Sequence, residues 1–295
     1  MGEDRVGHAA MDCRVLHHGA GQVYGPPINL AIMTDWQKVI DGGFQQPEGG
    51  LTPDLIAELS EALRSPNPVL RDEQALPVLA TWIPELDPAA RHRLADEMAA
   101  RFADPEIQAR TFAPLVLNVI LDQGDFDGAW LAAFTRWYPA ETDLRGYDAK
   151  LGWLHAVAHG ADLLGAFGRC PQADPAPLLD VAAARLLAHT DYLFAHQEDD
   201  RLAYAIALTL TRTELSEARS VDWLDPVRAD FEAGEPGPVP AHASNTMRTL
   251  RALYILADRG VRPEWNRGEQ VTLAHRDAVL QRLAAVLALV SPMAG

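Results

Sequence analysis

The chain has 295 residues, of which 48% are hydrophobic and 22% charged, as expected for a soluble globular protein. Its net charge of −16 argues against nucleic acid and against an anionic membrane as partners, because both need a basic surface. The two cysteines form no metal or redox motif, and neither a membrane helix of ~20 apolar residues nor a secretory signal is present. We therefore expect a cytoplasmic protein.

Residues 1–32 differ in composition from the rest of the chain. The segment from His17 to Pro27 is rich in Gly and Pro and has no helical period, whereas residues 34–40 form a capped amphipathic pattern. We expect a loosely ordered leader over 1–32, with Met33 as the true or an alternative start. Residues 33–295 are then predicted to form a single helical-repeat domain.

Helix starts are marked by an Asp or Thr directly before a proline. The side-chain oxygen can cap the helix, and proline suits the first helical position. The pairs are Thr52–Pro53, Asp87–Pro88, Asp104–Pro105, Asp174–Pro175 and Asp225–Pro226. Helices are predicted at about 34–40, 53–64, 69–82 (kinked at Pro77), 88–103, 105–122, 126–138, 147–167, 175–195, 199–214, 225–233, 243–258 and 270–290.

This pattern predicts an all-α fold, since no segment alternates as a strand does. Helices of this length joined by short connections indicate antiparallel neighbours. The first pair, a Leu-rich helix, a Pro/Asn turn and a second apolar helix, resembles one HEAT-type unit. Because the later units keep no strict period, we predict an irregular, HEAT-like α-solenoid in one elongated domain.

One segment, residues 145–164, concentrates chemically versatile side chains. In a single helix over about 147–167, four of them would lie within ~40° of one another: Asp148, His155, His159 and Asp162. The motif His-x-x-x-His-x-x-Asp could bind Zn²⁺, or Fe²⁺ or Mn²⁺ with further oxygen ligands, through the last three of these residues. It lacks the Glu of His-Glu-x-x-His, so a zinc protease is not indicated.

Two further polar clusters could face the same groove. The first contains Asp199, Asp200, Arg201 and Tyr204, and the second Asn245 and Arg248. In the first, Arg201 could pair with Asp162 or hold an anion. The simpler alternatives are helix capping for the first cluster and solvated arginines for the second.

Structural or binding roles are favoured for the histidines over a metal site, and metal-free acid–base catalysis is a further alternative. His155 and His159 could be buried and satisfied by hydrogen bonds to neighbouring helices. Gly152 and Gly160 each lower helix stability by up to ~1 kcal/mol relative to Ala, which predicts close packing beside both.

These residues also resemble a known bacterial family, domain of unknown function 2785. The resemblance rests on residues 145–148, the core Gly-Trp-x-His-Ala-x-Ala-His-Gly-Ala-Asp at 152–162, Asp199 to Arg201, and Asn245 with residues 250–254. It covers roughly residues 33–290. It implies a helical domain of the solenoid type and brings no activity with it.

The sequence therefore leaves two main functional hypotheses. The first is a binding module whose concave polar groove holds a peptide, a protein or a small polar ligand. The expected groove residues are Arg145, Tyr147, Asp148, His155, His159, Asp162, Asp199, Asp200, Arg201, Tyr204, Asn245 and Arg248. The second is a metal-dependent hydrolase with His155, His159 and Asp162 as ligands and Asp148 or Asp200 as general base.

Overall fold

The computed structural model describes residues 34–235, 237–263 and 268–291. Its elements are α1 (Trp36–Asp41), α2 (Pro53–Ala62), the π-helix η1 (Val69–Ala75), α3 (Leu76–Trp82), the 3₁₀-helix η2 (Ile83–Glu85), α4 (Pro88–Arg101), α5 (Ile107–Asp122), α6 (Gly128–Trp137), β1 (Tyr147–Asp148), β2 (Gly152–Trp153), α7 (Ala156–Arg169), α8 (Pro175–Leu187), α9 (Glu198–Leu210), α10 (Glu217–Val221), the 3₁₀-helix η3 (Asp222–Leu224), α11 (Asp225–Glu232), α12 (Ala241–Arg259) and α13 (Arg276–Ala288). The all-α prediction is confirmed.

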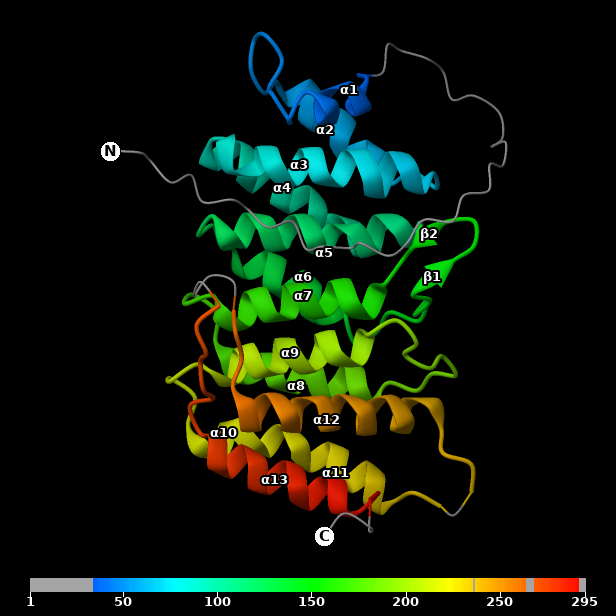
Figure 1. Cartoon of the computed structure of the whole chain (residues 1–295), viewed down its shortest axis with the longest axis vertical. Coiled ribbons are helices and arrows are strands. Elements are labelled where there is room, and N and C mark those ends of the chain that lie inside the picture. The colour runs from blue at the N-terminus through cyan, green and yellow to red at the C-terminus, as the bar shows by residue number, and fades with distance from the viewer. Residues whose placement is uncertain (1–33, 236, 264–267, 292–295) are drawn as a thin grey trace.

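The helices are stacked along the long axis of the molecule (Figure 1). In the layer facing the viewer, α5, α7, α9 and α12 pack side by side in that order, and α13 follows against α12. Helices α4, α6 and α8 lie behind, where α4 contacts α5 and α6, and α8 contacts α7, α9 and α12. Whether this stack is a HEAT-like solenoid remains a prediction.

A continuous apolar core runs between the layers. Its centre is aromatic: Phe134 of α6 stacks on Tyr138 at 5.2 Å between ring centroids and contacts Phe167 of α7 at 5.7 Å. The buried Tyr138 hydroxyl donates to the Val157 carbonyl over 2.8 Å, so its polar end is satisfied. This contact joins the layer of α6 to the first turn of α7.

Three of the five predicted helix caps are confirmed. Thr52, Asp87 and Asp174 each accept a backbone N–H from the first turn of α2, α4 and α8. Asp104 instead bonds the Glu106 amide in a turn, and α5 begins only at Ile107. Asp225 is itself the first residue of α11.

The segment before Pro77 changes its helical hydrogen-bonding register. Residues Val69–Ala75 form a π-helix, and the Leu76 N–H bonds the Arg71 carbonyl, five residues back. Proline has no N–H to continue an α-helical ladder, so the irregularity predicted at Pro77 falls in the turns that precede it.

The prediction of one helix over 147–167 is wrong. Residues 147–153 form a small antiparallel hairpin, in which Tyr147 pairs with Trp153, and α7 begins at Ala156. The Asp148 carboxylate accepts the N–H groups of Lys150 and Leu151 at 2.9 Å, a local bond that competes with helix formation. Asp148 is therefore not on the helical face of His159 and Asp162.

Two other predictions concern the ends and environment of the chain. The leader over residues 1–32 and the start at Met33 lie outside the described residues. Among the described helices, none combines the length and apolar character needed to cross a bilayer.

Close packing at Gly160, predicted from the sequence, is confirmed and gives a stability test. A Cβ atom at Gly160 would overlap the ring of the buried Tyr138. We expect Gly160→Ala to lower the free energy of unfolding by about 1–3 kcal/mol, because the added methyl overpacks the core. The matched control is Gly128→Ala in α6, where an added Cβ meets nothing within 4 Å. Urea denaturation of both variants measures the difference, and equal stabilities would contradict the packing argument.

Candidate metal centre

The hairpin before α7 is held in place by a buried arginine. Arg71 of η1 is fully buried and donates through Nη2 to the carbonyls of Leu151 at 2.6 Å and Trp153 at 3.1 Å. Its guanidinium also lies 4.6 Å from the centroid of the Phe112 ring. Because loop carbonyls need donors when they leave water, these bonds fix the course of the hairpin.

The hairpin delivers His155 to the N-terminus of α7. His155 is the cap residue and adopts φ 49° and ψ 41°, a left-handed conformation that is uncommon outside glycine. Only 8% of its surface is exposed, and Nε2 is buried without a hydrogen-bond partner in the described structure. Burial, followed by the nearby Arg201 and His196, lowers the pKa of His155 to about 3. The imidazole is therefore neutral at physiological pH.

The loop between α8 and α9 is held from α12. The Asn245 side chain accepts the Phe194 N–H and donates to the Tyr192 carbonyl, both at 2.9 Å. Arg248 donates to the Phe194 carbonyl at 2.7 Å and pairs with Asp199 at 2.6 Å. These side chains, predicted to line a groove, instead satisfy the loop backbone and the first turn of α9.

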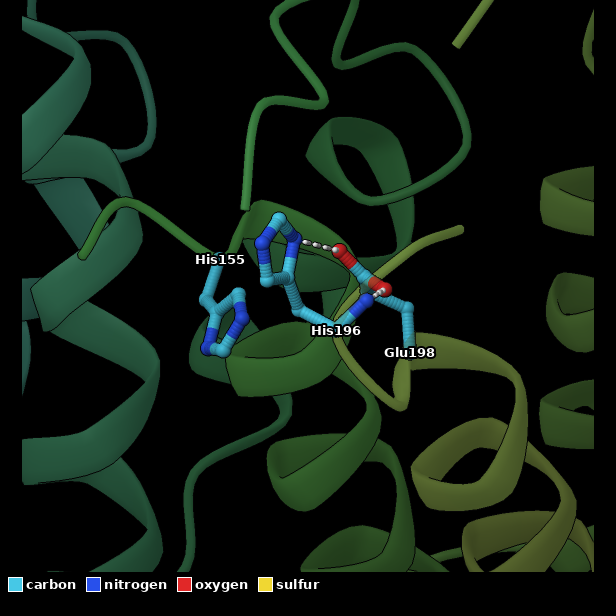
Figure 2. A group of neighbouring side chains, drawn as sticks. All are labelled: His155, His196 and Glu198. Carbon is cyan, nitrogen blue, oxygen red and sulfur yellow. Dashed lines mark hydrogen bonds and ion pairs between the residues drawn. The ribbon is translucent and has the colours of Figure 1, made fainter. Parts of the chain in front are cut away.

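The loop ends by placing His196 and Glu198 opposite His155. Gln197 between them has φ 65°, again left-handed, and Glu198 is fully buried. One Glu198 carboxylate oxygen accepts the backbone N–H of His196 at 2.7 Å, and the other lies 3.8 Å from Nδ1 of the His196 ring. Figure 2 shows the two imidazoles and the carboxylate grouped between α7 and α9.

These three residues offer ligand atoms that all lie within 4.8 Å of one another. Across the part of the chain that the structure describes, this is the one group of three or more His, Cys, Asp or Glu side chains that meets that condition. Two imidazoles and a carboxylate form a donor set suited to Zn²⁺, and Fe²⁺ can take it as well. We call His155, His196 and Glu198 the HHE cluster.

Aromatic side chains border the HHE cluster on the hairpin side. The Trp153 ring lies 4.4 Å from that of His155 and 5.4 Å from that of His196, measured between centroids. Tyr147 packs edge-on against Trp153 at 5.0 Å and is 53% exposed. The predicted groove residue Tyr147 is thus close to the cluster, at its solvent side.

The backbone at Gly146 lies so close to the HHE cluster that a Cβ atom would collide with two of its side chains. A Cβ there would lie 2.7 Å from Oε1 of Glu198 and 2.5 Å from Nδ1 of His196. Any larger residue would push these side chains away. The chain therefore passes the cluster at a distance that only glycine permits.

The structure does not group the predicted metal ligands His155, His159 and Asp162. His159 is buried, and its Nδ1–H donates to the Thr111 carbonyl at 2.9 Å. Asp162 pairs with Arg201 of α9, with Nε donating to Oδ1 at 3.0 Å. The structural alternative thus describes His159 correctly, whereas His155 is buried but lacks a partner for Nε2.

The remaining predicted site residues lie around this region in separate contacts. Arg145 pairs with Asp148 and with Asp143 on the surface, and hydrogen bonds from backbone amides together with Arg145 lower the pKa of Asp148. Asp200 is exposed, and partial burial followed by the neighbouring Asp199 raises its pKa. Tyr204 packs against the apolar core.

Sequence reasoning missed His196 and Glu198 as members of a site. The spacing of His196 matches no metal-ligand motif, and Glu198 has the position of an ordinary acidic residue at a helix start. No local pattern signals that Glu198 is fully buried. Only the packing of the loop against α12 and of the hairpin against η1 brings the cluster together.

The helices and this cluster define the class: an all-α protein with a candidate His/Glu metal centre at the N-termini of two adjacent helices. The chain belongs to the family described as "Protein of unknown function (DUF2785)", whose model matches residues 95–255. That range includes the hairpin, the α8–α9 loop and the HHE cluster. No curated protein and no solved structure matches the chain.

The role of Asn245 can be tested by truncation. We expect Asn245→Ala to destabilise the protein by about 1–3 kcal/mol, because it leaves a buried Phe194 amide without an acceptor. Hydrogen exchange should accelerate over residues 188–197 more than at the Leu154 amide, which bonds Gly146 within the hairpin segment. A uniform effect on both segments would contradict a local anchoring role.

The buried histidines predict a loss of stability in acid. Burial lowers the pKa of His159 well below its ordinary value, so the folded state stays neutral where the unfolded chain, near pH 6.5, begins to bind protons. Stability is then fully present above about pH 6.5 and falls as the pH decreases, by up to about 1.4 kcal/mol per pH unit for each such histidine.

Urea denaturation of the parent protein and His159→Gln between pH 7.5 and 5 measures this dependence. The variant should lose stability less steeply, because one buried titrating group is gone. If both proteins lost stability with the same slope, the pKa of His159 would be the same in the folded and unfolded states, and the prediction would be wrong.

Proposed function

We propose that this chain is a metal-dependent hydrolase, with His155, His196 and Glu198 as the metal ligands. The observation that carries the proposal is the convergence of three ligand atoms within 4.8 Å. In a centre with metal–ligand bonds of about 2.0–2.1 Å, neighbouring ligand atoms lie about 3.3 Å apart. Side-chain adjustments on the order of 1 Å would therefore close the cluster around an ion.

The charge of Glu198 supports a cation at this position. Its carboxylate is fully buried, and the ion-pair partner recorded for it in the described structure is His196. A buried carboxylate is costly unless a positive charge neutralises it. A divalent ion would supply that charge and would also occupy the unpartnered Nε2 of the neutral His155.

The donor set supports hydrolysis as the chemistry. Catalytic zinc sites use three protein ligands, including the His₂Glu set, and keep a further position for water or substrate. A bound metal would polarise a carbonyl or phosphoryl oxygen and lower the pKa of a bound water toward neutrality. Asp148 or Asp200 as general base remains a prediction.

We also propose that the scaffold is an irregular HEAT-like α-solenoid. The side-by-side order of α5, α7, α9 and α12 supports it. In such an array the ends of successive helices lie along one edge, and the two loops that carry the HHE cluster both precede helices of this layer.

A binding module without chemistry is the second candidate. It is favoured by an open hollow of about 420 Å³ between α2 and α4, lined by apolar residues such as Leu51 and Ile56 and by acidic residues such as Glu97. A peptide or small polar ligand with a basic group would suit that lining. This hollow is distinct from the HHE cluster, so the two candidates can be tested separately.

Metal content distinguishes the HHE cluster from the ligand set expected from sequence. The full chain, incubated with Zn²⁺ and freed of excess ion, should retain one equivalent by elemental mass spectrometry. His196→Ala should weaken Zn²⁺ binding by at least about 100-fold, because a direct ligand is lost. Asp162→Asn is the matched control and should retain the ion, because Asp162 pairs with Arg201 instead.

The opposite pattern, with zinc lost in Asp162→Asn and kept in His196→Ala, would restore the ligand set predicted from sequence. Absence of zinc in the parent protein would overturn the metal centre. Once zinc is bound, chromogenic esters, phosphoesters and dipeptides can be screened with Glu198→Gln as the inactive reference, and no turnover of any class would argue against a hydrolase.

A further inference from the structure

The hydroxyl of Tyr192 lies among the ligand atoms of the HHE cluster. Its Oη is 3.2 Å from Nδ1 of His196 and 3.3 Å from Oε1 of Glu198, and those two atoms are 3.8 Å apart. Ligand atoms of a tetrahedral centre with bonds of about 2.0 Å lie about 3.3 Å from one another. The three atoms therefore already approximate one triangular face of a four-coordinate site.

We propose that Tyr192 is the fourth protein ligand of this site, so that the complete donor set is two imidazoles, a carboxylate and a phenolate. The proposal rests on the metal centre proposed above and deepens it. Zn²⁺ suits such a set of two nitrogen and two oxygen donors, and so does iron, whereas Cu(I) prefers sulfur ligands.

The position of the hydroxyl is fixed by bonds that do not involve the metal. Oη accepts the Gly146 N–H at 2.9 Å, and the Tyr192 N–H bonds the Thr190 hydroxyl at 3.0 Å. The Tyr192 carbonyl accepts from Asn245 at 2.9 Å. The side chain is thus held before an ion arrives, and the Gly146 N–H would remain to stabilise the negative oxygen afterwards.

The binding step balances without a further reactant. The phenol O–H bond breaks, an oxygen–metal bond forms, and the proton passes to the solvent. With Tyr192 bound, the fourth position holds no water. A substrate or water must then displace the phenolate or add as a fifth ligand, so Tyr192 would control access to the metal.

The test is a Zn²⁺ titration of the full, metal-stripped chain, followed by ultraviolet difference spectroscopy and by proton release. Zn²⁺ has no spectrum of its own, so an ionised-phenol signal reports ligation by tyrosine. We expect one such signal per ion in the parent protein and in the control Tyr147→Phe, which alters an exposed tyrosine beside the site. Tyr192→Phe should lack it, should release about one proton fewer per ion, and should bind Zn²⁺ at least tenfold more weakly.

The outcomes separate this proposal from the one it rests on. Zn²⁺ binding by the parent without a phenolate signal, and with the same proton release as Tyr192→Phe, would overturn ligation by Tyr192 and leave the HHE cluster intact. A parent protein that binds no Zn²⁺ would overturn both. If Tyr192→Phe does not fold by circular dichroism, the parent spectrum alone decides, since a missing signal there suffices.

Discussion

The geometry of the candidate site depends on Asn245, whose buried side-chain amide bonds two backbone groups of the α8–α9 loop. It accepts the Phe194 N–H and donates to the Tyr192 carbonyl. A backbone segment can leave water only if its donors and acceptors find partners, and this loop has no helix or sheet of its own to provide them. Arg71 likewise donates hydrogen bonds to two carbonyls of the hairpin. The helices thus act as a rigid frame, and buried polar side chains fasten two loops to it.

Around the HHE cluster, Glu198 is paired with a histidine in the described structure, whereas two nearby acids are paired with arginines. Asp162 and Arg201 neutralise each other across α7 and α9, and Asp199 is paired with Arg248 across α9 and α12. Among the described residues, the ion-pair partner of Glu198 is His196, an imidazole that is charged only when protonated. Because Asp162 and Asp199 each have an arginine partner, the missing positive charge is specific to Glu198, where a metal ion would supply it.

Much of the scaffold could be predicted because it follows from local rules. Caps at Thr52, Asp87 and Asp174 and the tight packing at Gly160 each depend on a residue and its immediate surroundings. The hairpin could not be predicted from helical spacing, since a favourable apolar face at 153–167 masked the turn made by Asp148. The HHE cluster joins residues about forty positions apart through contacts with two further helices, and sequence spacing carries no record of such contacts.

Backbone strain adds an independent reason to regard this region as functional. His155 and Gln197 are two of the three non-glycine residues with positive φ in the described chain, and each immediately precedes a helix. Such conformations cost on the order of 1 kcal/mol and persist only where surrounding contacts enforce them. A glycine at either position would relieve that cost, but at 155 it would also remove a candidate ligand. Both strained residues lie at or beside the HHE cluster, so the contacts that position the candidate ligands also enforce these backbone conformations.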